Sequence, residues 1–273
     1  MWETIIVNPF TNALLFIYKL IGGNFGIAII LFTILIRVIT HPLMASQIKG
    51  STKMQEMQNS KEWLDIQKKY KDDKEKLAQE QMKYYKEIGY NPLSSCLPSL
   101  IQIPLIFGLY QSITRAMAAS PLQLLTLTRT VYPFFQIGDL VPLNSRFLWM
   151  NLGQPERVYA FGIAIPFLAI IVALTTYVQS KVTMPPSTNP NDQGAMMGKM
   201  MVLYMPLLLG YFALTFASGL SVYFITGNLI GIAQYALLGK VNWRALLPGQ
   251  KPAPGQKPAS GQKPAPGLAA RKK

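Results

Sequence analysis

Five long apolar stretches constrain the fold of this chain more than any other feature. A helix that crosses a bilayer needs about 20 mostly apolar residues, and the chain has such stretches at 25–43, 93–117, 158–180, 200–217 and 218–238. Half of the residues are hydrophobic and only 14% are charged, whereas soluble domains average about 25% charged residues. We therefore predict an all-α, polytopic membrane protein with five transmembrane helices.

The residues before the first stretch predict a segment on the outer face of the membrane. Residues 1–24 lack the basic start and the small-residue cleavage pattern of a secretory signal, and Asn8-Pro9 interrupts their apolar run. Residues 10–20 have the pattern of an amphipathic interfacial helix, with Gly22-Gly23 as the bend into the first span. The alternative is that these residues lengthen the first span.

The basic residues predict the orientation of the spans. The chain carries 26 Lys and Arg against 12 Asp and Glu, a formal net charge of +14. Twenty of the basic residues lie in 44–92, 181–199 and 239–273, whereas only four lie in 1–24 and 118–157. Because basic loops stay in the cytoplasm, we predict a cell-membrane protein with its amino end and its 118–157 loop outside. The other three segments are then cytoplasmic.

Residues 44–92 predict a cytoplasmic helical hairpin. They are rich in Lys, Glu, Gln and Met and contain no proline before Pro92, which favours helix, and the turn is expected at 71–73. A hairpin that only connects two spans is one interpretation. The other is a mobile recruiting arm, whose methionines supply adaptable apolar contacts. The residues assigned to recruitment are Met54, Met57, Lys71, Asp72 and Asp73.

Residues 239–273 predict a basic, disordered tail. From Pro248 a six-residue Pro-Gly-Gln-Lys unit repeats, and proline and glycine at this density prevent a packed core. The tail has eight basic and no acidic residues, so it suits ribosomal RNA or anionic lipid headgroups. A role only in fixing topology is the alternative. The residues assigned to polyanion binding are Lys251, Lys257, Lys263, Arg271, Lys272 and Lys273.

Arg37 is an ionisable residue well inside a predicted span. A charge at the bilayer centre costs about 2.5–3.5 kcal/mol on insertion scales, so an intramembrane arginine indicates a functional site. The alternative is that Arg37, about 9 Å from Leu43 at ~1.5 Å per residue, extends its side chain to the headgroups.

Polar residues on four spans favour the functional interpretation of Arg37. They recur at helical spacing near the cytoplasmic ends of the spans, and polar groups that face lipid are costly. We therefore predict a water-filled cavity that opens to the cytoplasm. The outer halves of the first two spans are nearly all apolar, which argues against a continuous pore. The polar residues are Thr33, Thr40, His41, Ser95, Ser99, Gln102, Thr175, Thr176, Gln179, Thr226, Asn228 and Gln234.

The sequence offers no residues for the common enzymatic sites. Cys96 is the single cysteine and His41 the single histidine, so a disulfide framework, a zinc site or a Ser-His-Asp triad is not expected. The run 194–199 is one residue too short for a phosphate-binding loop, and no carboxylate pair lies within the spans. We predict no enzyme activity, no metal site and no cofactor.

Several motifs occur in the order found in one known family. An arginine-bearing first span ends in HPLM at 41–44 and is followed by the charged hairpin. NPLSSCLPSLIQIPLIFGLY occupies 91–110, FLWMNLG occupies 147–153 and SGLSVYFITGNLIGIAQ occupies 218–234. Over about residues 5–240 the sequence resembles the YidC/Oxa/Alb family of membrane protein insertases.

The resemblance implies a function and a site. The site is a cytoplasm-facing hydrophilic groove with Arg37 as its arginine and Gln102, Asn228 and Tyr223 as further positions. The implied partners are nascent membrane proteins, received from ribosomes alone or beside the Sec translocon, with the hairpin as the recruiting element that touches the ribosome or a targeting receptor. We expect neither the extra first span and large outer domain of Gram-negative members nor the lipoprotein cysteine of many Gram-positive ones. Its tail repeat is no family motif.

We therefore predict an insertase that lets a hydrophilic segment enter the membrane halfway while it is still solvated. Arg37 would attract acidic residues of that segment in a low-dielectric environment. The alternative is a small transporter or channel for an anionic or peptide substrate, which predicts a polar lining in the outer half that the sequence lacks. A scaffold that only binds ribosomes would leave Arg37 without a function.

Overall fold

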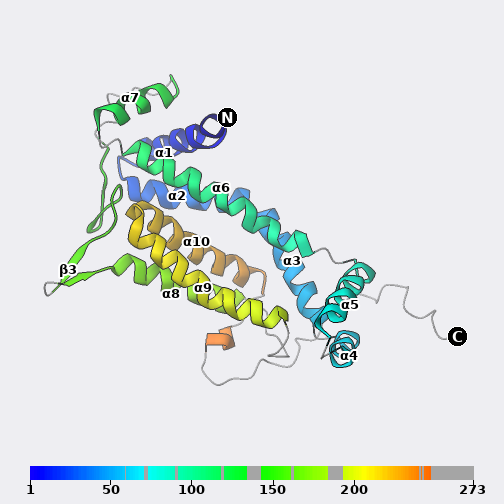
Figure 1. Cartoon of the computed structure of the whole chain (residues 1–273). Coiled ribbons are helices and arrows are strands. Elements are labelled where there is room, and N and C mark those ends of the chain that lie inside the picture. Colours follow the sequence, from blue (N-terminus) through cyan, green and yellow to red (C-terminus); the bar gives the residue numbers. More distant parts are fainter. Residues whose placement is uncertain are drawn as a thin grey trace.

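The computed structural model consists mostly of helices (Figure 1). It describes residues 1–58, 60–70, 73–89, 92–117, 120–133, 143–160, 163–183, 193–239, 241 and 243–246. The helices are a π-helical turn η1 (Glu3–Val7), α1 (Asn8–Leu20), α2 (Phe25–Ile39), α3 (His41–Gln58), α4 (Lys61–Lys69), α5 (Lys74–Glu87), α6 (Pro92–Ala116), α7 (Pro121–Thr130), α8 (Phe167–Thr183), α9 (Gln193–Thr215), α10 (Ser218–Leu237) and a 3-10 turn η3 (Trp243–Leu246). The strands are β1 (Arg146–Phe147), β2 (Met150–Asn151), β3 (Val158–Ala160) and β4 (Ile163–Ile165).

Helix α10 is the centre of the bundle. It packs against α2, α6, α8 and α9, while α1 packs against α2 and α6. Figure 1 shows α7 and the strands at one end of this bundle and the α4–α5 hairpin at the other. We call these the strand end and the hairpin end.

The amino-terminal helix is longer and more buried than the sequence predicts. Helix α1 starts at Asn8, directly after η1, and its Leu14 and Leu15 are buried against other helices. Phe16 and Leu20 on the same helix are exposed, so α1 keeps one outward apolar face. The turn into α2 falls at Gly22-Gly23, as predicted, because both residues have a positive φ that favours glycine.

Helices α2 and α3 meet at a bend of 59°. Pro42 explains the bend, because proline has no backbone N–H and its ring clashes with the carbonyl four residues earlier. Among the described residues, α10 alone is long and apolar enough to cross a membrane, and α2 joined to His41–Gly50 passes the same test as a bent pair. Helix α8 and Met200–Thr215 are shorter apolar helices, so the number of spans stays a prediction.

The predicted third span differs from the observed helix. The sequence places its start at Val158, but β3 and β4 form an antiparallel hairpin there, in which Val158 pairs with Ile165. Helix α8 begins only at Phe167 and continues to Thr183. The helix starts after Pro166, and the Glu156 carboxylate accepts a hydrogen bond from the Leu168 N–H in its first turn. β-branched residues, which favour strands, precede this proline.

The other predicted boundaries differ less. The fourth apolar stretch is part of a longer helix, since α9 begins at Gln193 within the predicted 181–199 loop. The predicted 118–157 loop contains α7 and the β1–β2 hairpin. Helix α10 ends at Leu237, one residue before the predicted end of the fifth stretch.

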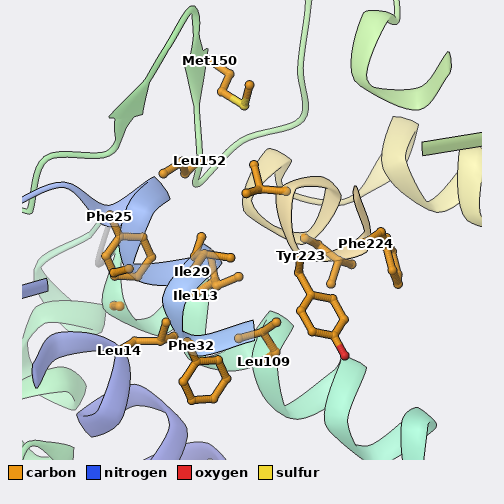
Figure 2. Packing of buried hydrophobic residues seen from close by; sticks show 14 of the residues in the cluster. Leu14, Phe25, Ile29, Phe32, Leu109, Ile113, Met150, Leu152, Tyr223 and Phe224 are labelled. Atoms are coloured by element: carbon orange, nitrogen blue, oxygen red, sulfur yellow. The ribbon is translucent and has the colours of Figure 1, made fainter. Parts of the chain in front are cut away.

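The main apolar core lies at the strand end (Figure 2). Phe25 and Ile29 of α2, Ile113 of α6 and Leu152 of the loop after β2 are all fully buried there. The loop is fixed to the start of α10 because the Gly219 N–H donates to the Leu152 carbonyl at 3.0 Å. Burial of these side chains is the main source of stability at this end.

The outward faces of the bundle are strongly apolar. Large hydrophobic side chains on α2, α6, α8 and α9 are between 39% and 67% exposed. A soluble protein rarely leaves so many apolar residues on one surface, and contact with lipid acyl chains explains them. They are Ile27, Leu31, Ile34, Leu35, Val38, Ile103, Phe107, Phe167, Ile170, Leu174, Met200, Leu203, Tyr204, Leu207, Tyr211 and Leu214.

Helices α4 and α5 form a hairpin with a small core of its own. The ring of Trp63 on α4 stacks on Tyr84 of α5 at a centroid distance of 6.3 Å. Burial raises the pKa of Tyr84 above its ordinary value. Asp73 caps the first turn of α5, and the hydrogen bond from the Lys76 N–H lowers the pKa of its carboxyl group. The predicted turn residues Lys71 and Asp72 and the side chains of Met54 and Met57 lie outside the described residues.

Candidate functional site

The polar residues predicted on separate helices converge on α10 at the hairpin side of the main core. Arg37 comes from α2, Gln102 from α6, and Tyr223, Asn228 and Gln234 from α10. Each of these residues contacts a neighbouring helix. We call them the Arg37 cluster.

Arg37 lies in the last turn of α2 and is half-buried. Its guanidinium packs directly against the backbone of Gly227, because a Cβ atom added to Gly227 would lie 2.9 Å from Arg37 Nη2. It also interacts electrostatically with Tyr223. Among the described residues, no carboxylate oxygen lies within 4.0 Å of this guanidinium. The positive charge of Arg37 is therefore held in the bundle without an ion pair from that part of the chain.

Tyr223 connects α10 with α6. Its hydroxyl oxygen accepts a hydrogen bond from Gln102 Nε2 at 2.6 Å, and the residue is only 4% exposed. Figure 2 shows the Tyr223 ring pointing away from Leu152, with its hydroxyl beside α6. A buried hydroxyl that keeps a hydrogen bond avoids the desolvation cost of an unpaired polar group.

Asn228 and Gln234 connect α10 with the other two helices. Asn228 Nδ2 donates to Thr176 Oγ1 at 2.9 Å and to Thr175 Oγ1 at 3.1 Å, both on α8. Gln234 Nε2 donates to the Arg37 carbonyl at 3.3 Å, close to the α2–α3 bend. The same amide lies 3.3 Å from His41 Nδ1. Its Oε1 is buried and has no hydrogen-bond partner within the described part of the chain, so this amide has an unused acceptor.

The remaining predicted site residues are placed differently. Thr33 is fully buried and donates to the Ile29 carbonyl, and Thr40 donates to the Ile36 carbonyl. Their own helix therefore occupies the donors of both hydroxyls. Thr226 is half-buried on α10. The Ser99 side chain and all six tail residues assigned to polyanion binding lie outside the described residues.

Two glycines of the site were not identified by the sequence analysis. Gly227 meets Arg37, and Gly231, one helical turn further along α10, meets the Gln179 amide of α8. Both lie within the predicted fifth span. Their four-residue spacing, beside the polar residues Asn228 and Gln234, is the feature of the sequence that could have indicated them. Within the described ranges, no group of three or more His, Cys, Asp or Glu residues could hold a metal ion.

Comparison with known proteins places the chain in a family. Residues 16–244 match the family described as 60Kd inner membrane protein. The chain is 34% identical over 239 residues to membrane protein insertase MisCA of Bacillus subtilis (strain 168), an alignment that covers 87% of this chain and 78% of that protein. It is 33% identical over 242 residues to membrane protein insertase YidC 2 of Bacillus anthracis, with 87% and 81% covered.

A solved structure supports the same assignment. An active YidC insertase, crystallised with its first transmembrane domain resolved, aligns with a TM-score of 0.50 at 25% identity. The alignment covers 87% of this chain and 46% of the solved chain, so this chain spans about half the length of that protein. The family match covers most of the sequence and both relatives exceed 30% identity. The chain therefore belongs to the YidC/Oxa/Alb family of membrane protein insertases.

Proposed function

We propose that this chain is a membrane protein insertase that receives hydrophilic segments of nascent membrane proteins at the Arg37 cluster. Family membership supports the general activity, since the relatives are named membrane protein insertases. The exposed apolar faces of α2, α6, α8 and α9 support a position within the bilayer. In this proposal the chain crosses the membrane five times, with the hairpin end and the basic tail in the cytoplasm.

The observation that carries the proposal is the charge of Arg37, which no carboxylate of the described residues pairs. A guanidinium inside an apolar bundle is costly, and proteins normally pair it with a carboxylate. The guanidinium of Arg37 instead lies beside neutral groups, the Gly227 backbone and the Tyr223 side chain among them. A site of this kind suits a carboxylate that arrives with the substrate.

The mechanism follows from this charge and from the polar neighbours. An acidic segment that enters the groove would exchange part of its hydration for the guanidinium and for the second N–H of the Gln102 amide, which lowers its desolvation barrier. The adjacent apolar span of the substrate then moves into lipid along the exposed apolar faces. No covalent bond changes, so the chain acts without enzymatic chemistry.

Recruitment is a separate part of the proposal. The α4–α5 hairpin lies at the end of the bundle where a nascent chain would arrive (Figure 1). Residues 239–273 carry eight basic and no acidic side chains, which suits contact with ribosomal RNA. We assign ribosome binding to the tail, and contact with the ribosome or a targeting receptor to the hairpin.

The test uses the full chain in proteoliposomes and single-span substrates that differ only in an acidic or a neutral amino-terminal tail. For Arg37→Ala we expect insertion of the acidic substrate to fall roughly 10- to 30-fold, because two charges ~8 Å apart at an effective dielectric of ~20 attract by about 2 kcal/mol. Arg37→Glu should reduce it further. The neutral substrate should change little.

Arg115→Ala is the matched control, because Arg115 also lies in the last turn of an apolar helix but pairs with Glu3. It should insert both substrates at rates near those of the unmodified chain. Wild-type insertion of the acidic substrate by both Arg37 variants would refute charge attraction. Site-directed crosslinking from Gln102 and Asn228 to a stalled nascent chain tests the groove directly, and no crosslinks from either position would exclude it.

A further inference from the structure

Two glycines on α10 make room for polar side chains from two different helices. A Cβ atom added to Gly227 would lie 2.9 Å from Arg37 Nη2, and one added to Gly231 would lie 2.5 Å from Gln179 Nε2. Ordinary Cβ contacts are 3.4–4 Å long. An alanine at position 227 would therefore clash with Arg37 of α2, and an alanine at position 231 would clash with Gln179 of α8.

These glycines differ from those that serve packing. A Cβ on Gly26 would lie 2.2 Å from the Phe147 ring, and one on Gly219 would meet the Leu152 carbonyl and two buried isoleucines at 3.1 Å. The neighbours of these two glycines are side chains in or against the main core and a backbone carbonyl, which have little freedom to move. At Gly227 and Gly231 the neighbours are the free ends of long, flexible side chains. An added methyl there displaces polar groups and leaves the core in place.

The spacing of the two glycines puts both contacts on one face of α10. Residues four apart lie on the same face of a helix, about 6 Å apart along its axis. Arg37 Nη2 and Gln179 Nε2 are both hydrogen-bond donors, so the glycines bring two donors to neighbouring turns of α10. Two donors at this separation suit the carboxylates of one acidic chain segment.

We propose that Gly227 and Gly231 are positioning residues, which hold the Arg37 guanidinium and the Gln179 amide against α10 for an acidic segment of the inserting protein. This inference rests on the proposed function, and it adds Gln179 to the residues that contact the substrate. Neither glycine touches the substrate itself, and each acts through the side chain that it admits.

The test compares alanine variants in the same proteoliposomes. Gly227→Ala should lower insertion of the acidic substrate about twofold, the loss expected when the same charge pair opens from ~8 to ~10 Å at an effective dielectric of ~20. Insertion of the neutral substrate and the melting temperature should stay unchanged. Gly210→Ala is the matched control, because Gly210 lies inside α9 and a Cβ there would meet Ala173 at 3.3 Å. It should leave both substrates unaffected.

Double variants show whether each glycine acts through its proposed partner. Gly227→Ala should cause no further loss in the Arg37→Ala background, and Gly231→Ala none in the Gln179→Ala background, since the group to be positioned is already absent. Additive losses, or equal losses with the acidic and the neutral substrate, would overturn the positioning role.

The outcomes also separate this inference from the proposed function. If Arg37→Ala inserts the acidic substrate at the wild-type rate, charge attraction itself is wrong. If Arg37→Ala is impaired but Gly227→Ala is not, charge attraction stands and only the role of the glycine is refuted.

Discussion

Two arginines lie in the last turns of apolar helices, Arg115 at the strand end and Arg37 on the hairpin side of the main core, and their contacts differ. At the strand end, Arg115 Nη2 donates to Glu3 Oε1 at 2.8 Å and Nη1 donates to Asn8 Oδ1 at 3.1 Å. At the hairpin side, no carboxylate of the described residues lies within 4.0 Å of Arg37. Arg115 therefore ties the amino-terminal segment to α6, whereas Arg37 has no such partner among the described residues.

The surroundings of the two arginines follow the same division. The strand end is built from fully buried apolar residues such as Phe25, Ile29 and Leu152. Around Arg37, the buried residues include Asn228 and Gln234, and Gln234 Oε1 has no partner within the described part of the chain. One end thus gives the bundle its stability, and the other holds polar groups at a cost in stability. This division makes opposite predictions for substitutions at the two ends.

The largest expected effect is at the strand end. Phe25→Ala removes a fully buried ring and should lower the free energy of unfolding by about 3–5 kcal/mol, because the cavity does not close completely. Chemical unfolding in detergent micelles measures this change. Leu31→Ala on the same helix is the control, since Leu31 is 39% exposed and its loss should cost far less. Equal losses of unfolding free energy at Phe25 and Leu31 would mean that the main core does not lie at the strand end.

The second prediction has the opposite sign. Arg37→Met replaces a charge that no described carboxylate pairs by an apolar side chain of similar length, so the free energy of unfolding should rise by about 1–3 kcal/mol. Insertion of the acidic substrate should fall in the same variant. Arg115→Met should instead lower stability, because it leaves Glu3 and Asn8 without their partner. A loss of stability in Arg37→Met equal to that in Arg115→Met would break the comparison.

The third prediction concerns the hydrogen bond between α6 and α10. Tyr223→Phe leaves the half-buried Gln102 amide without its acceptor and should cost about 0.5–1.5 kcal/mol, the net contribution of a typical hydrogen bond. Gln102→Leu combined with Tyr223→Phe should cost less than the two single changes together, because both polar partners are then gone. A strictly additive pair in thermal unfolding would show that this bond does not stabilise the bundle.

The residues of the polar side can be picked out from the sequence, because an amphipathic pattern is visible within a single helix. Arg37, Gln102, Asn228 and Gln234 stand out as polar residues in apolar stretches. In the structure Arg37 and Gln102 contact α10, to which Asn228 and Gln234 belong. The pattern could not show that the Thr33 hydroxyl is used by its own helix, since that depends on its rotamer. Gly227 was missed because a glycine has no side chain to mark which neighbour it admits.

The strand end was harder to predict, because its contacts join residues far apart in the chain. Arg115 and Glu3 are 112 residues apart, and the local sequence around either residue does not indicate that they pair. The start of α8 at Phe167 depends on Glu156, a loop residue that caps the helix from outside the apolar stretch. Hydropathy continues through β3 and β4, so only the proline before α8 indicated that the helix starts later than the apolar run.

The smallest expected effect tests the ion pair of Arg115. Glu3→Gln removes the charge of a side chain that is 68% exposed, so the free energy of unfolding should fall by only about 0.2–1 kcal/mol. The difference from the unmodified chain should shrink further as salt is raised to ~1 M, because exposed charge pairs are screened. Thermal unfolding at two salt concentrations measures both changes. A salt-independent loss well above this range would mean that the Arg115–Glu3 pair is buried in the membrane-embedded protein. Arg115 and Arg37 would then both lie in a low-dielectric environment and would differ only in having a carboxylate partner.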